Sequence, residues 1–144
     1  MKTKKIFLSL LFCFFYYASN ACECAPSSLK QTYALSDYVL RVKVVEITDS
    51  IQYDLYSNPV KPPYKYGNRP ILKVEKIYKG QLANETIKLA ATDSMCDYYF
   101  EIGNEYVILI KEIKGELVTS VCMNNFELPN KEALQEVKTL SYQK

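Results

Sequence analysis

Two cysteines separated by one residue lie near the beginning of the chain, in the segment Cys22-Glu23-Cys24-Ala25-Pro26. If a signal peptidase cuts before Cys22, that cysteine becomes the first residue of the mature protein. Its free α-amine and its own carbonyl oxygen can then bind one metal ion together. The sulfur atoms of both cysteines remain available for disulfide bonds. The segment therefore predicts a metal-binding N-terminus that cysteines hold in place.

The residues before Cys22 have the three-part pattern of a secretory signal peptide. Lysines at positions 2, 4 and 5 precede an apolar run over residues 6–17, and Ser19 and Ala21 are small residues where the peptidase reads. The run is shorter than the about 20 residues of a membrane-spanning helix, which disfavours an uncleaved anchor. We predict that residues 1–21 are a signal peptide and that 22–144 form a single secreted, extracellular domain.

Composition excludes several classes of function. The sequence has 18 basic and 16 acidic residues; without its three signal lysines the balance is 15 against 16, a formal charge of −1. No basic patch remains to favour a nucleic acid or an anionic membrane as partner. The chain has no histidine, which excludes Ser/His and Cys/His nucleophilic catalysis and most zinc enzymes. We predict a protein that is not an enzyme and needs no cofactor.

The chain has five cysteines, and Cys13 leaves with the predicted signal peptide. The four that remain, in an exported domain, predict two disulfide bonds. A Cys22–Cys24 bond would close a very small, strained ring. Each of these two cysteines is therefore expected to pair with Cys96 or Cys122, and both such pairings remain open. Either one ties the N-terminus to two distant points of the chain.

Hydrophobic periodicity predicts the elements that must position these cysteines. We predict a helix over 27–35, strands over 38–47, 70–78, 86–91, 106–111 and 117–121, and a final helix from about Asn130. The alternation breaks near Glu75, which predicts a β-bulge. This pattern predicts a mainly β fold, a five-stranded antiparallel OB-like barrel with a short N-terminal helix and a C-terminal helix packed on it. A β-sandwich is the main alternative.

A long insertion over residues 48–68 separates the first two predicted strands. It contains three prolines and four tyrosines, namely Tyr53, Tyr56, Tyr64 and Tyr66. A loop of this length is usually functional, and tyrosines provide rigid contact area in binding loops. An extended hairpin whose tyrosines pair across its strands is an equally good interpretation.

Several segments, taken in order, are similar to one known family. They are Cys22-Glu-Cys24-Ala-Pro26, residues 36–43, residues 74–80, Cys96 after Ser94-Met95, residues 103–108, and Cys122 with Asn125-Phe126. Together they resemble the inhibitory domain of the tissue inhibitors of metalloproteinases, which belong to the netrin-like group of OB-fold domains. The resemblance covers residues 22 to about 127.

The resemblance implies a partner, a mechanism and a disulfide pairing. The partner is a zinc metalloendopeptidase, whose catalytic zinc binds the α-amine and carbonyl of Cys22 in trans. Residues 22–26 form an inhibitory wedge in which Glu23 points into the enzyme's specificity pocket. Ser94 and Met95 flank it, and the loop over 48–68 reaches along the enzyme surface. Cys22 pairs with Cys96, and Cys24 pairs with Cys122.

Three features depart from the family pattern. Glu23 stands where the family has a small, hydroxylated or aliphatic residue, and a carboxylate loses its hydration in an apolar pocket unless a cation meets it. We therefore expect poor inhibition of ordinary matrix-type enzymes and a target with a basic pocket; a solvated linker residue is the other interpretation of Glu23. Ala34 replaces a family cysteine, so a third disulfide is missing. We also expect no counterpart of the cysteine-rich second domain of the animal inhibitors.

Three other functions compete with inhibition. The residues up to Cys22 form a loose lipoprotein box, and lipidation of Cys22 would give a cell-surface lipoprotein, the one case in which we expect a membrane partner. A netrin-like domain without inhibitory activity could serve as a protein-contact module, since fold does not determine function. A metal carrier with Cys22 and Cys24 as thiolate ligands is the third.

Overall fold

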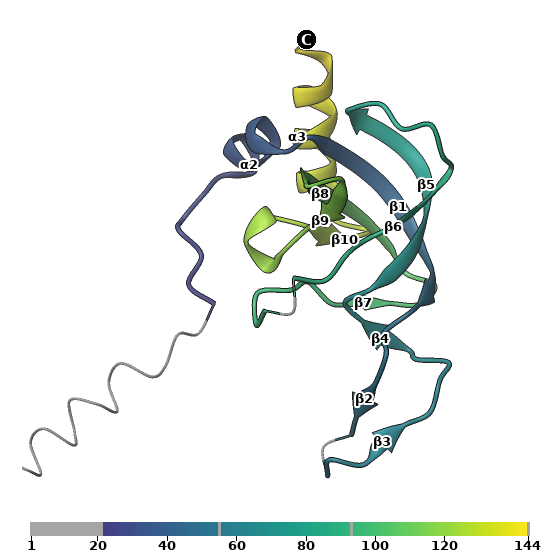
Figure 1. The fold of residues 1–144 in the computed structure, drawn as a ribbon. Coiled ribbons are helices and arrows are strands. Elements are labelled where there is room, and N and C mark those ends of the chain that lie inside the picture. The colour runs from purple at the N-terminus through teal and green to yellow at the C-terminus, as the bar shows by residue number, and fades with distance from the viewer. Residues whose placement is uncertain (1–21, 55, 93, 144) are drawn as a thin grey trace, which may run out of the picture.

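A strongly curved antiparallel sheet forms the centre of the protein (Figure 1). The computed structural model describes residues 22–54, 56–92 and 94–143, so the predicted signal peptide lies outside the described residues. The strands are β1 (Tyr38–Ile47), β2 (Gln52–Tyr53), β3 (Pro59–Val60), β4 (Tyr66–Gly67), β5 (Pro70–Lys79), β6 (Thr86–Lys88), β7 (Phe100–Glu101), β8 (Glu105–Ile113), β9 (Glu116–Val118) and β10 (Phe126–Glu127). The helices are α2 (Leu29–Leu35), the 3-10 helix η1 (Val121–Met123) and α3 (Lys131–Tyr142).

The main sheet has the strand order β10-β8-β1-β5-β6, and β9 pairs with β8 further along that strand. All of its ladders are antiparallel, which confirms the predicted mainly β fold. The sheet curls like an OB barrel, but the barrel is not closed by a strand ladder, because β6 and β9 do not pair with each other. Ala90 N–H, just after β6, donates to Leu117 O of β9 at 2.9 Å.

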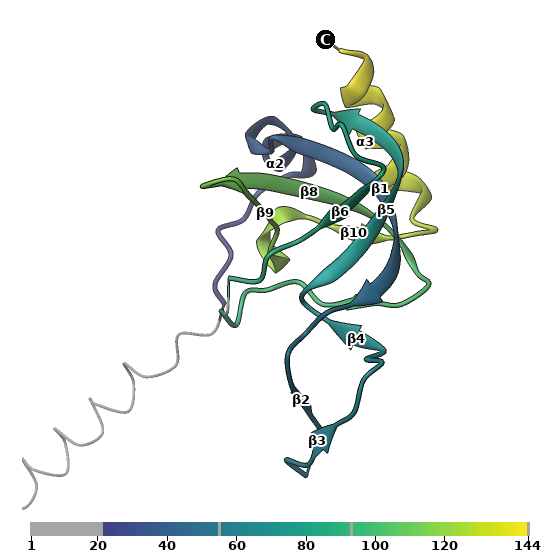
Figure 2. The same ribbon diagram turned by 45° about the vertical axis from the view of Figure 1, so that its right-hand side comes forward.

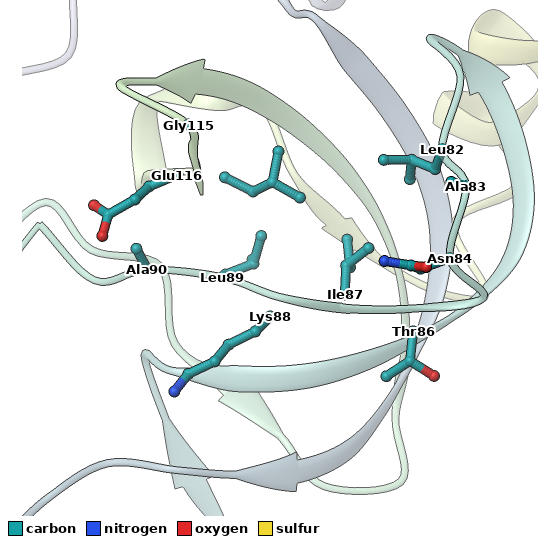
Figure 3. A pocket seen from close by; sticks show the side chains of 11 residues that line it. Leu82, Ala83, Asn84, Thr86, Ile87, Lys88, Leu89, Ala90, Gly115 and Glu116 are labelled. Atoms are coloured by element: carbon teal, nitrogen blue, oxygen red, sulfur yellow. The ribbon is translucent and has the colours of Figure 1, made fainter.

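A groove of about 480 Å³ lies beside this hydrogen bond, where β6 and β9 part (Figure 3). Leu82, Ile87 and Leu89 line it from the β5–β6 side, and Gly115 and Glu116 line it from the other. The groove contains none of the residues of the predicted wedge.

Strand alternation gives the protein two cores, one on each face of the sheet. Leu40, Val42 and Val44 of β1 are buried in the barrel interior, as the period of two predicts. Val39 points the opposite way and joins Val107 and other side chains of β8 under the helices. β8 is buried on both faces, which explains its continuous apolar sequence.

Both helices lie at one end of the barrel, and α2 contacts α3 (Figures 1 and 2). The Ser28 hydroxyl accepts from Gln31 N–H and the Gln31 side chain accepts from Ser28 N–H, a capping box that starts α2. The Asn130 side chain caps α3, and Val137 is buried in the second core. These observations confirm both predicted helices and the packing of the last one on the barrel. Within the described residues, no helix is both long enough and apolar enough to cross a membrane.

The predicted strand positions are mostly confirmed, and the differences come from tertiary pairing. β1 matches its prediction, and the β-bulge is confirmed because Arg41 pairs with Lys76 while the next residue, Val42, pairs with Val74. The strand expected over 86–91 ends at Lys88, since its continuation turns toward β9. The strand expected over 117–121 ends at Val118 and leads into η1.

The described residues within 48–68 form an arm that extends from the end of the barrel opposite the helices (Figures 1 and 2). A two-stranded ladder of β2 and β3 confirms the predicted hairpin. The expected pairing of tyrosines across its strands is wrong, because the register places Tyr53 opposite Pro59. Tyr64 instead enters the barrel core, and Tyr66 pairs with Glu101 of β7.

Candidate functional site

Two disulfide bonds tie the N-terminal segment to the barrel. Cys22 is bonded to Cys96 and Cys24 to Cys122, with Cα–Cα distances of 5.2 and 5.3 Å. This is the pairing that the resemblance implies. The Sγ atoms of Cys22 and Cys122 are 3.8 Å apart, so the two bonds form one cluster. All four sulfur atoms are in disulfides, which leaves no thiolate among them to bind a metal and argues against the metal-carrier hypothesis.

The predicted wedge residues form an exposed ridge around these bonds. Cys22 is half-buried, and the four residues that follow it are exposed. Ser94 and Met95 are exposed beside Cys96, and Met95 has 75% of its surface accessible. The first described residues run from α2 down to the loop that holds Cys96 (Figure 1). The structure therefore places residues 22–26, Ser94 and Met95 together, and we call this set the wedge.

A small hydrogen-bond network shapes the loop that holds Cys96. Cys96 N–H donates to Ser94 Oγ at 3.2 Å, and the hydroxyls of Ser94 and Thr92 are 2.8 Å apart. Thr92 N–H donates to Asp97 Oδ1 at 3.0 Å, and Asp97 N–H donates to Ser94 O at 3.2 Å. The loop is therefore closed on itself, which fixes the direction of the Cys96 side chain.

Asp97 also connects this loop to the arm. Its side chain is only 3% exposed, and Asn68 Nδ2 donates to Asp97 Oδ2 at 2.9 Å. Asn68 lies at the base of the arm, where Arg69 N–H donates to Asp49 Oδ1 at 3.0 Å across the two limbs. Thr48 N–H donates to Arg69 O at 2.9 Å beside it. The base of the arm is thus clamped and joined to the wedge loop.

Asn125 fixes the second disulfide anchor. Its Oδ1 accepts from Leu109 N–H at 2.8 Å, and its Nδ2 donates to Thr119 Oγ1 at 2.9 Å and Ser120 O at 3.0 Å. Ser120 Oγ in turn accepts from Cys122 N–H at 3.3 Å. One side chain therefore replaces a missing strand partner of β8 and shapes the turn that presents Cys122.

Backbone and side-chain contacts also join the two anchors to each other and to α2. Val121 N–H donates to Cys96 O at 2.9 Å, so the segments that hold Cys96 and Cys122 are directly bonded. Asn124 Nδ2 donates to Ser27 O and to the Thr32 hydroxyl, each at 3.1 Å. These contacts hold the chain on both sides of the wedge.

An aromatic group follows the loop in sequence and belongs to the barrel core. The rings of Tyr98 and Tyr106 both lie edge-to-face against Phe100, with centroids 5.0 and 5.3 Å from it. Burial raises the pKa of the Tyr98 and Tyr106 hydroxyls above their ordinary value. Both tyrosines are therefore neutral at physiological pH, and Tyr106 is part of the barrel core against which Tyr98 packs.

Exposed apolar and aromatic side chains lie together near the base of the arm. Ile51, Tyr53, Tyr66 and Tyr99 are each at least 49% exposed. They line a groove of about 430 Å³ together with the clamp residue Asp49. Tyr99 follows the wedge loop in sequence, so the groove and the wedge belong to neighbouring segments.

Sequence reasoning located the cysteines and the ridge but missed the residues that support them. Asp97 directly follows a cysteine, yet its partner Asn68 is 29 positions away and no local pattern connects the two. Asn125 was part of a segment that resembles the family, but its bond to Leu109 depends on the folded position of β8. Long-range hydrogen bonds of polar side chains, such as these two, leave no periodic pattern in the sequence.

Comparisons with known proteins identify a family for this curled antiparallel barrel and its disulfide-held, exposed N-terminal ridge. A sequence model of the family described as "Tissue inhibitor of metalloproteinase" matches residues 20–140. The chain is also similar to the "Tissue inhibitor of metalloproteinase" of Drosophila melanogaster, with 24% identity over 103 residues. That match covers 72% of this chain and 46% of the fly protein, so the chain spans about half the length of this relative.

The chain therefore belongs to the tissue inhibitor of metalloproteinase family. Proteins of this family are inhibitors and not enzymes, in agreement with the prediction made from the missing histidines.

Proposed function

We propose that this protein inhibits zinc metalloendopeptidases by binding the target's catalytic zinc through the α-amine and carbonyl oxygen of a mature N-terminal Cys22. Family membership supports inhibition in general. The observation that supports this mechanism most is the Cys22–Cys96 disulfide, which anchors the residue that would chelate the zinc and leaves the four residues after it exposed.

The chemistry of the proposed contact is simple. Catalytic zinc sites keep a coordination position open for water or substrate. An α-amine has a pKa of about 8, so part of it is neutral at physiological pH, and zinc displaces the remaining protons. The amine and the carbonyl of Cys22 would replace the enzyme's water and leave it without its nucleophile.

The two disulfides would lower the cost of binding. A flexible peptide loses conformational entropy when it enters an active site, whereas an anchored one has already lost it. Cys22 and Cys24 are both bonded to the barrel, and Glu23 between them has little freedom of its backbone. Ser94 and Met95 would contact the enzyme on the flank of the wedge, and the arm would contact its surface further away.

Glu23 narrows the range of targets. Its side chain is exposed, and within the described residues it has no hydrogen bond or ion pair. A carboxylate in an apolar specificity pocket would lose its hydration without compensation. The favoured target is therefore a metalloendopeptidase whose pocket contains a lysine or arginine.

Glu23 also favours a second candidate function, a netrin-like contact module without inhibitory activity. A lipoprotein anchored through Cys22 is the membrane form of that alternative. Lipidation needs the Cys22 sulfur, which is in the bond to Cys96. Both alternatives require the folded barrel, and neither requires a free α-amine on Cys22.

The exported protein itself tests these proposals. The protein should be recovered outside the cell. Its intact mass and N-terminal sequence should show a chain that starts at Cys22, contains two disulfide bonds and bears no lipid. It should then inhibit at least one zinc metalloendopeptidase in a peptide-cleavage assay. A lipid on Cys22, or residues left ahead of it, contradicts the zinc-binding mechanism.

A further inference from the structure

We propose that Asp97 is a positioning residue that couples the wedge to the arm, so that the two act as one rigid contact surface. The inference rests on the proposed inhibitory function for its consequence, but the coupling is a property of the free protein. It assigns a role to a buried carboxylate that lies outside the wedge itself.

On the wedge side, Asp97 closes the loop that holds Cys96. Oδ1 accepts hydrogen bonds from both the N–H and the hydroxyl of Thr92. The Thr92 hydroxyl is in contact with Ser94 Oγ, which accepts from Cys96 N–H. A continuous path of hydrogen bonds therefore leads from Asp97 to the cysteine that anchors Cys22.

On the arm side, the other carboxylate oxygen of Asp97 accepts from Asn68 Nδ2 at 2.9 Å. Asn68 N–H and Arg69 N–H both point at the carboxylate of Asp49, at 3.4 and 3.0 Å. Gln52 Nε2 also donates to Asp49 Oδ2, at 3.1 Å. Movement of the arm base must therefore strain the Asn68–Asp97 bond.

The burial of Asp97 makes this link effective. A carboxylate that is 3% exposed needs donors to replace its lost hydration, and a buried charged group with a missing partner is costly. Thr92 and Asn68 supply these donors from two different segments. A change in the relative position of the wedge loop and the arm base would therefore weaken the hydrogen bonds of a buried carboxylate.

Exchange of the two partners tests the link. Asn68→Asp places a second carboxylate against Asp97 and removes the donor. In the double variant Asn68→Asp/Asp97→Asn, the new amide at position 97 can donate to the new carboxylate, and the bond returns with reversed polarity. Asp97→Asn alone should have a smaller effect, because the Asn68 amide can rotate to present its oxygen. Asn84→Asp, an exposed site, is the matched control.

Two measurements separate the coupling from the function. Amide hydrogen exchange in the free protein should become about tenfold faster in both 65–69 and 92–97 for Asn68→Asp, and return to the wild-type rate in the double variant. Inhibition of a responsive metalloendopeptidase should weaken about tenfold and recover in the same way.

Faster exchange confined to 65–69, or no recovery in the double variant, would overturn the coupling. If the wild-type protein inhibits no metalloendopeptidase, the proposed function fails, while the exchange rates still decide whether Asp97 couples the two segments.

Discussion

In the proposed complex, Glu23 would determine how the wedge interacts with an enzyme, because it is the residue between the two anchored cysteines. Its backbone is restrained on both sides, so in that complex it could not withdraw from the enzyme's pocket without moving Cys22. The free energy of inserting it depends on whether the pocket supplies a cation. Under the proposed mechanism, specificity at this position would depend on charge rather than on shape.

We expect Glu23→Thr to improve inhibition of metalloendopeptidases with apolar specificity pockets by at least about tenfold, because the hydroxyl is far less costly to desolvate than a carboxylate. Inhibition constants measured against a panel of such enzymes check this. Glu46→Thr, an exposed strand position away from the wedge, should leave every constant unchanged. If Glu23→Thr leaves inhibition of every tested enzyme at zero, the contact-module function is favoured, whereas measurable inhibition that does not change would contradict the role given to Glu23.

Asn125 should be among the polar residues most important for stability. Asn125→Ala leaves Leu109 N–H and Ser120 O without their partners, and we expect a loss of about 2–3 kcal/mol in the free energy of unfolding. Urea denaturation measures it. Asn84→Ala, at an exposed position, should change the free energy by less than about 0.5 kcal/mol; an equal, small loss for both variants would contradict the role of Asn125.

At the scale of elements, the arm depends on a close approach of its limbs at Gly67. A Cβ atom at this position would lie 2.3 Å from Ile47 Cγ2 and 2.5 Å from both carboxylate oxygens of Asp49. The clamp at the arm base therefore requires glycine there. Gly67 lies in β4 and pairs with Phe100 of β7, which belongs to the aromatic group of the barrel core.

Gly67→Ala should consequently destabilise the protein by about 2–4 kcal/mol, through a clash in a packed region. Gly103→Ala is the control, because its methyl group meets nothing within 4 Å and only its positive φ adds strain, about 1 kcal/mol. Thermal unfolding of both variants compares them. A melting temperature for Gly67→Ala no lower than that of Gly103→Ala would show that the arm base tolerates the extra atom.

Elements with a strong local signal could be predicted from the sequence, and short ones could not. β1 and both helices have clear periodicity and capping residues, and the bulge in β5 interrupts a regular alternation. β7 and β10 have two residues each, too few for a period, and they form because β4 and β8 present free edges to them. The same limit applies to the site: the cysteines are visible in the sequence, whereas the Asn68–Asp97 link exists only in the folded protein.

At the scale of the whole molecule, the wedge, the arm and the barrel form one connected structure. The disulfides join the N-terminus to loops at the barrel end, and the hydrogen bond between Val121 and Cys96 joins those loops to each other. The helices lie at the end opposite the arm (Figure 2), and Asn124, just after η1, donates to the Thr32 hydroxyl of α2. The ridge is therefore joined to α2 as well as to the barrel.

The stability of the whole protein should be insensitive to pH near neutrality and fall in alkali. The chain has no histidine to titrate between about pH 5 and 8. Burial raises the pKa of Tyr33, Tyr78, Tyr98 and Tyr106 in the folded state. The folded state thus holds these protons more tightly than the unfolded chain does. The contribution of the four tyrosines to the free energy of unfolding is complete below about pH 10, their ordinary pKa in the unfolded chain, and is lost as the pH rises through their higher pKa in the folded state.

Melting temperatures between pH 6 and 11 check this prediction. They should stay level to about pH 9 and decline above about pH 10. Tyr98→Phe should reduce the alkaline decline, while Tyr56→Phe, at a residue that is 85% exposed, should not. A decline that begins between pH 6 and 8 would contradict this assignment.

The most direct test of zinc binding by the Cys22 amine is a comparison of two proteins that differ by one residue. One begins at Cys22 and the other retains Ala21 ahead of it, with both disulfides intact in each. Because the extra residue converts the amine into an amide, which cannot bind the zinc in the same way, inhibition of a metalloendopeptidase should weaken by about a hundredfold or more. Equal inhibition by the two proteins would contradict the mechanism.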